Sequence, residues 1–193
     1  YQSHTGQMMG FDRTSWRDAA YPTSHMGVIA LMRQTFLDAS NYHASNSTTP
    51  SCFSQVTPND TTFFYDTSHE LEALLAGKIT AEFENPNTVI VGSGSEHRRL
   101  DPIVEMGFPV IVPLTFPEEP EVWTINDAES VTLSTLQHWE RAPANARWLS
   151  NAGLKVALTT SKLRDDENFL DNLHTAIQAG LPASDALAML TTN

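Results

Sequence analysis

The sequence predicts an α/β fold built around a parallel sheet. Three short runs are continuously apolar: "NTVIVGS" at 87–93, "FPVIVPL" at 108–114 and "LKVALTTS" at 154–161. Strands covered on both faces of a parallel sheet read in this way, whereas half-exposed strands alternate apolar and polar residues. Helical stretches separate the three runs. Alternation of this kind predicts βαβ units with right-handed crossovers.

Before the first of these strands, the sequence predicts two helices and long irregular segments. Residues 1–22 show no clear period and are expected to form a loop. Apolar residues at helical spacing over 23–42 predict a helix with Thr23 or Ser24 as its N-cap. Residues 42–68, rich in Ser, Thr, Asn and Pro, are expected to form a long loop. A short helix is then expected over 68–78, with Gly77 as its stop.

From the first strand onward the pattern is regular. A helix ending at Gly107 is expected, then a loop over the acidic, Pro-rich stretch 115–130. Further helices are expected over 131–142, 142–153, 166–180 and 182–192. Three parallel strands alone leave both sheet edges unpaired. The chain is therefore predicted to be a portion of a larger α/β domain, or to hold more strands in its poorly patterned regions.

The composition is that of a globular protein and argues against several classes of function. The chain has 193 residues, 40% of them hydrophobic, and a formal net charge of −12. Its eleven Lys and Arg residues are scattered, with Arg98-Arg99 as the one tight pair, so nucleic-acid binding is not expected. The sequence has no apolar run near the roughly 20 residues that span a bilayer. A single cysteine, Cys52, excludes a disulfide within this chain and a Cys-rich zinc site.

Candidate site residues lie where the predicted strands end, because ligands of parallel α/β folds meet the carboxyl ends of the strands. The candidate pocket residues are Ser93, Glu96, His97, Thr115, Thr160 and Ser161. The loop 92–95 precedes a helix, so it either presents backbone N–H groups to an anion or forms a tight turn with Ser95 as N-cap. We favour the tight turn.

The residues themselves predict no metal site. The seven histidines form no HxH, HExxH or HxxxH pair; His138 is expected to pack or to be hydrogen-bonded, and His174 to lie on the surface. The acids 165–167 precede a helix, where they cap N–H groups and interact favourably with the helix dipole. A Ser-His-Asp hydrolase is disfavoured because G-x-S-x-G is not matched.

Four segments, in order along the chain, resemble the catalytic barrel of the amidohydrolase superfamily, and in particular its imidazolonepropionase-related branch. They are residues 21–42, 89–117, 136–161 and 168–193. The resemblance implies a (β/α)8 TIM barrel of the metal-dependent hydrolase type, of which residues 1–193 are a partial domain. It also implies hydrolysis of C–N bonds with zinc or another divalent metal activating water. An exported protein, periplasmic or extracellular, is favoured by the same resemblance.

This chain departs from the metal ligands that the resemblance implies. The HxH strand would lie before Tyr1, Gly92 or Ser93 stands at the sixth-strand histidine, and Ser161 stands at the eighth-strand aspartate. A serine hydroxyl brings no charge to a dication and is too weak a base. The fifth strand should lie near 78–84, where the sequence is too short for a strand and a helix. A segment is therefore expected to be missing between Thr80 and Ala81.

Two functions are consistent with these observations. In the first, the chain is a fragment of an amidohydrolase-like protein that hydrolyses a C–N bond, non-peptide or cyclic amide, in a small-molecule substrate. This fragment would hold no metal or other cofactor, would be inactive alone, and would need the rest of the parent chain to complete the barrel. In the second, the barrel is degenerate and non-catalytic, and acts as a binding or interaction module.

Overall fold

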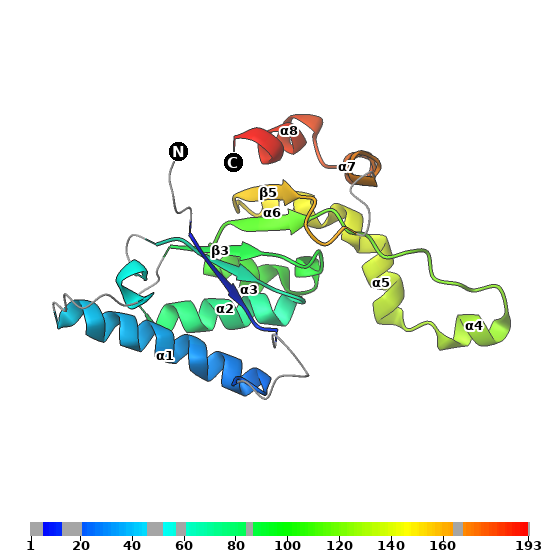
Figure 1. Cartoon of the computed structure of the whole chain (residues 1–193). Helices are drawn as coiled ribbons and strands as arrows, with labels where there is room; N and C mark the ends of the chain where they lie inside the picture. Colours follow the sequence, from blue (N-terminus) through cyan, green and yellow to red (C-terminus); the bar gives the residue numbers. More distant parts are fainter. Residues whose placement is uncertain are drawn as a thin grey trace. The chain divides into compact units, whose positions relative to one another are not determined.

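The structure is a computed structural model that describes residues 6–12, 21–45, 52–56, 61–83, 87–163 and 168–192 (Figure 1). The chain divides into two compact units. The first unit comprises residues 1–68 and 72–90, and the second comprises residues 69–71 and 91–193. Among the helices of the described residues, none has both the length and the apolar character that crossing a membrane requires.

The described chain contains five strands, which follow one another in the sheet in their sequence order. The strands are β1 (Gln7–Gly10), β2 (Phe63–Asp66), β3 (Thr88–Val91), β4 (Val110–Pro113) and β5 (Val156–Thr159). The α-helices are α1 (His25–Ala44), α2 (Glu70–Glu82), α3 (Leu100–Met106), α4 (Ile125–Ser130), α5 (Leu133–Arg141), α6 (Asn145–Asn151), α7 (Phe169–Gln178) and α8 (Ala183–Thr191). Three 3-10 helices, η1 (Cys52–Gln55), η2 (Glu96–Arg99) and η3 (Ala142–Ala144), complete the set.

Strand pairing is parallel in both units. β1 pairs with β2, with Gln7 opposite Phe63. β4 pairs with β5, with Val110 opposite Val156. Parallel strands in sequence order, separated by helices, are the arrangement of consecutive βαβ units. The fold is therefore α/β with a five-strand parallel sheet, which is consistent with part of an α/β barrel.

Strands β1 and β2 lie in segments that the sequence predicts as loops, so both predictions are wrong over these residues. Each strand has four residues, and a run this short shows no clear period among flanking polar residues. On β2, Phe63 and Tyr65 are buried and Asp66 is exposed. The expected loop 42–68 also contains the end of α1 and all of η1, while residues 46–51 and 57–60 of it lie outside the described residues.

Helix α2 overturns the helix stop predicted at Gly77. It runs from Glu70 to Glu82, past the expected stop at Gly77 and across the Thr80–Ala81 bond. Glycine ends a helix where it adopts a left-handed conformation, and Gly77 instead lies buried in the helix. The segment expected to be missing between Thr80 and Ala81 stays a prediction.

The first unit is held by an aromatic cluster between α1 and its neighbours. The hydroxyl of Ser24 caps α1 by accepting from the N–H of Gly27 at 3.1 Å. Further along α1, Phe36 packs against Phe63 of β2, with ring centroids 5.0 Å apart, and against Phe83, at 4.9 Å. Helices α1 and α2 lie side by side (Figure 1), and Arg33 pairs with Glu82 across them.

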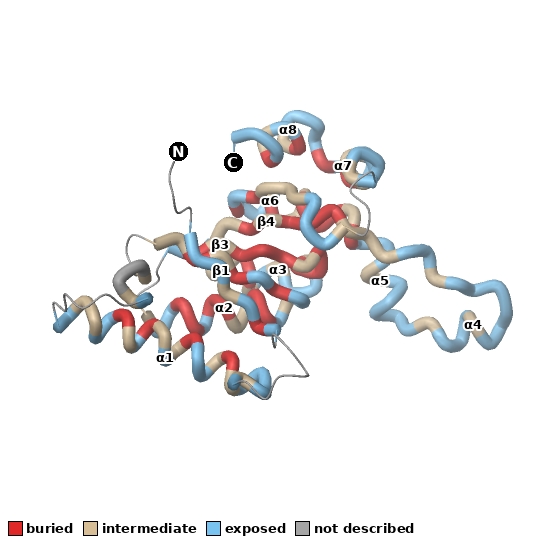
Figure 2. Tube along the Cα trace, viewed as in Figure 1, coloured by how far each residue is buried: buried red, intermediate tan, exposed pale blue. Residues whose placement is uncertain are grey.

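The second unit carries the regular βαβ pattern predicted from the sequence. Helix α3 ends at Gly107, whose φ of 71° is left-handed. Helices α6 and α8 contact β5, and the predicted helices α5 and α7 are present. Helix α4 falls in the predicted loop 115–130, where Thr124 and Asp127 form a capping box. Most of α4 and α5 is exposed (Figure 2).

Candidate functional site

The loop after β3 is built around the buried carboxylate of Glu96, which is 0% exposed. Its Oε1 accepts from the backbone N–H of Ser93 at 2.6 Å and from the Ser93 hydroxyl at 3.1 Å. Its Oε2 accepts from the N–H of Gly94 at 3.1 Å and from the amide of Asn145 at 2.7 Å. One of the two interpretations of this loop assigned the N–H groups of Ser93 and Gly94 to an external anion. In the structure these groups are bonded to the chain's own carboxylate.

Two glycines make this arrangement possible. Gly94 has a φ of 87°, in the left-handed region that glycine adopts without strain. At Gly92 a Cβ atom would lie 2.7 Å from Oε1 of Glu96, closer than van der Waals contact allows. The sequence Gly-Ser-Gly-Ser is thus explained by the close approach of the Glu96 carboxylate to the loop.

Hydrogen bonds connect this loop to α6 and to the start of α2. Asn145, the first residue of α6, accepts through Oδ1 from the backbone N–H of His97 at 2.8 Å. Ser95 precedes η2, as predicted, but its side chain makes no cap bond. The Ser95 hydroxyl instead donates to Oε2 of Glu70 at 3.0 Å. Asn145 and Glu70 were not predicted from the sequence, because their roles depend on contacts between distant segments.

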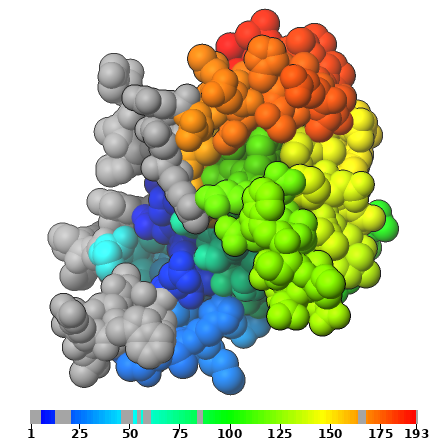
Figure 3. All heavy atoms as spheres, turned by 90° about the vertical axis from the view of Figure 1, so that its right-hand side faces the viewer, coloured from blue at the N-terminus to red at the C-terminus, as the bar shows by residue number. Residues whose placement is uncertain are grey.

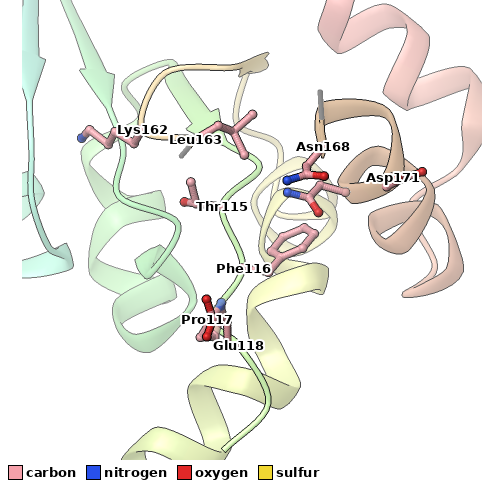
Figure 4. A pocket seen from close by; sticks show the side chains of 9 residues that line it. Thr115, Phe116, Pro117, Glu118, Lys162, Leu163, Asn168 and Asp171 are labelled. Carbon is pink, nitrogen blue, oxygen red and sulfur yellow. The ribbon is translucent and has the colours of Figure 1, made fainter. Parts of the chain in front are cut away.

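A cavity of about 600 Å³ lies beyond the ends of β4 and β5, and we call it the β4–β5 pocket. Its lining residues are Thr115, Phe116, Pro117, Glu118, Lys162, Leu163, Asn168, Asp171 and Asn172. Phe116 and Asn168 lie next to one another, whereas the Lys162 side chain extends away from them (Figure 4). Nζ of Lys162 donates to the carbonyl oxygen of Gly92 at 3.0 Å. In the space-filling view, helices α7 and α8 and the residues that follow β4 lie on the same face of this unit (Figure 3).

The structure places the candidates Thr160 and Ser161 in an exposed turn after β5. The N–H of Ser161 donates to Oγ1 of Thr159 at 3.1 Å, and the N–H of Leu163 donates to the carbonyl oxygen of Thr160 at 3.1 Å. Neither Thr160 nor Ser161 lines the β4–β5 pocket. The next two residues of the chain, Lys162 and Leu163, line it instead. Of the candidates, Thr115 lines this pocket, and Ser93 and Glu96 belong to the buried loop network.

A second cavity of about 330 Å³, which we call the basic pocket, lies between η2 and α5. It is lined by Glu70, His97, Arg98, Arg99, Ser134, Gln137, His138 and Arg141. The imidazole rings of His97 and His138 stack, with centroids 5.4 Å apart and planes 10° from parallel. The sequence named His97 as a candidate and showed the Arg98-Arg99 pair, but did not indicate that Arg141 lies beside them.

Both imidazoles in the basic pocket resist protonation. Burial and then the neighbouring His138, Arg98 and Arg141 lower the pKa of His97 to about 4, against an opposing effect of Glu96. Burial and then Arg98 lower the pKa of His138, and Glu70 and Glu96 oppose this. At neutral pH the two rings are therefore uncharged.

The lowered pKa of His97 predicts a loss of stability in mild acid. As the pH falls below 6.5, the His97 ring of the unfolded chain takes up a proton. In the folded chain the ring stays neutral until the pH approaches its pKa of about 4. The free energy of unfolding should therefore fall as pH drops through this window. A His97→Gln variant should lose less stability than the original chain between about pH 7 and 5.5. Titration of the His97 ring by NMR checks the assignment, and a midpoint near 6.5 would contradict it.

The described residues do not fit the metal centre that the family resemblance implies. They contain no group of three or more His, Cys, Asp or Glu side chains able to hold an ion. At the strand ends, Glu96 has both oxygens bonded to the loop and to Asn145. The acidic residues 165–167, which are expected from the sequence to cap a helix, lie outside the described residues.

Comparison with known proteins supports the fold. No family model matches the sequence, and no curated protein matches it. A solved structure of an amidohydrolase from Thermotoga maritima MSB8 matches with a TM-score of 0.70 and 20% sequence identity, over 97% of this chain and 50% of that one. The chain is thus amidohydrolase-like in fold and spans about half the length of that protein. The imidazolonepropionase-related branch stays a prediction.

Proposed function

We propose that this chain is part of an amidohydrolase-like protein in which the strand ends of the second unit bind a small polar molecule without a metal. The single observation that carries the proposal is the bonding of Glu96. In this unit it is the buried carboxylate of the strand-end loop, and it accepts four hydrogen bonds from the chain itself. A carboxylate used in this way stabilises a loop and is not available as a metal ligand or a general base.

The β4–β5 pocket is the site proposed for the small molecule. Its volume of about 600 Å³ falls within the range of ligand-binding cavities. Phe116 and Leu163 provide apolar surface, and the Thr115 hydroxyl and the Asn168 amide provide groups that both donate and accept. A pocket with this lining suits a small molecule that carries amide or hydroxyl groups.

A second candidate is that the whole protein hydrolyses a C–N bond, non-peptide or cyclic amide, as the imidazolonepropionase-related resemblance implies. The observation that favours it is the fold likeness to an amidohydrolase over nearly all of this chain. Its metal ligands would come from parts of the protein outside this chain or from residues that the structure does not describe. In this view the rest of the parent chain completes the barrel, and export is a further expectation of the same resemblance.

The metal content of this chain tests the first candidate, and metal-dependent turnover by the parent protein separates the two. After purification with zinc available, this chain is expected to contain substoichiometric transition metal by elemental analysis, because its described residues offer no set of three ligands. Zinc held at one ion per chain by three or more side chains would contradict the proposal. In the parent protein, metal-dependent turnover of N-acyl or cyclic amide substrates would favour the second candidate. Binding of such compounds without turnover, with NMR shifts at Thr115 and Asn168, supports the first.

A further inference from the structure

We propose that the basic pocket binds the phosphate group of a small phosphorylated molecule through Arg98, Arg99 and Arg141. The pocket shares no lining residue with the β4–β5 pocket. The proposal therefore does not depend on the function proposed above, and binding in the two pockets is separable by experiment.

The charge in the basic pocket is the first argument. The chain as a whole is strongly acidic, yet three of its eleven Lys and Arg residues line this one cavity. Within the part of the chain that the structure describes, no hydrogen bond or ion pair joins Arg98, Arg99 or Arg141 to another side chain. Guanidinium groups gathered without carboxylate partners repel one another, and a bound anion relieves that repulsion.

The carboxylate of Glu70 does not neutralise the pocket. It is the acidic residue in the lining, and its Oε2 accepts from the Ser95 hydroxyl. With both imidazoles neutral, three guanidinium groups and one carboxylate leave a net charge of +2. That charge matches a phosphate monoester, which carries between −1.5 and −2 near neutral pH, by the general value of about 6 for its second pKa.

The stacked imidazoles are the second argument. The Nδ1 atoms of His97 and His138 are buried and have no hydrogen-bond partner among the described residues. Buried polar atoms are normally bonded, so each unpartnered atom calls for an explanation. A neutral imidazole carries one N–H group, and the tautomer with its proton on Nδ1 donates to an anion bound beside the rings.

The arrangement of donors favours phosphate over carboxylate. Arg98 and Arg99 come from η2, and Arg141 comes from the end of α5, so the guanidinium groups belong to two separate elements. A planar carboxylate is satisfied by one guanidinium fork, whereas the three terminal oxygens of a phosphate group accept from several donors at once. Ser134 and Gln137 add a hydroxyl and an amide to the lining.

Isothermal titration of the whole chain with inorganic phosphate, sulfate and acetate tests the proposal. We expect saturable binding of phosphate that weakens as salt is added. Arg98→Gln and Arg141→Gln should each weaken it about tenfold or more, since each removes a charge-assisted hydrogen bond. Both arginines are exposed, so neither variant should unfold, and circular dichroism checks this. Lys155→Gln is the matched control, because it removes one exposed positive charge that lies just before β5.

Phosphate affinity equal to that of the original chain in both arginine variants would overturn the location of the site. Acetate binding as tight as phosphate binding would overturn the ligand class, and so would an absence of phosphate binding. The ring resonances of His97 and His138 provide a second measurement. Phosphate should shift both of them upward in pKa, which a loosely attracted surface ion would not do.

Discussion

Replacing Glu96 with alanine is expected to lower the free energy of unfolding by about 3–5 kcal/mol. The carboxylate is 0% exposed and accepts from two backbone N–H groups, a hydroxyl and an amide. Its removal leaves the N–H groups of Ser93 and Gly94 and the amide of Asn145 without their acceptor. Each buried donor left unpaired costs about 1–3 kcal/mol. Urea-induced unfolding of the original and variant chains measures the difference.

The matched control for this prediction is Glu105→Ala. Glu105 is an exposed acid on α3, and its loss should change the free energy of unfolding by at most about 0.5 kcal/mol. Glu96→Gln should fall between the two variants, because the amide keeps one accepting oxygen but turns an NH₂ group toward donors. In Glu96→Ala the backbone amides of Ser93 and Gly94 should also exchange with solvent faster. If Glu96→Ala were no less stable than Glu105→Ala, the bonding of the loop would be refuted.

The sequence predicts the second unit better than the first, for a physical reason. Strands β3, β4 and β5 are confirmed, and each lies within one of the short apolar runs that predict strands of a parallel sheet. Strand β2 is harder to recognise because it is short, flanked by polar residues and ends in the exposed Asp66. Helix α4 has its capping box in the sequence, at Thr124 and Asp127, but the surrounding acidic and Pro-rich residues favoured a loop.

Among the site residues, those marked by local sequence were easier to predict than those that depend on contacts between distant segments. Two candidates chosen for their position at a strand end, Thr115 and His97, line the two pockets. That position did not indicate that Ser161 turns to solvent, since the direction of a side chain after a strand depends on the turn. Arg141 was not predicted, because it lies near Arg98 and Arg99 only when α5 packs against η2.

In the first unit, Phe36→Ala is expected to lower the free energy of unfolding by about 3–5 kcal/mol. Phe36 is 1% exposed and lies against the rings of Phe63 and Phe83. Truncation removes the transfer free energy of the ring and leaves a cavity that these two neighbours fill only in part. Phe36→Leu keeps most of the apolar volume and should cost roughly a third as much. Urea-induced unfolding followed by circular dichroism measures both variants.

Leu37→Ala is the control on the same helix, because Leu37 is 50% exposed and alanine is at least as good a helix former. Its expected effect is at most about 0.5 kcal/mol. The comparison also tests strand β2, which the sequence did not predict. Phe63 faces Phe36 only because residues 63–66 form a strand that directs alternate side chains to the same side. If Phe36→Ala cost no more than Leu37→Ala, neither that packing nor the register of β2 would hold.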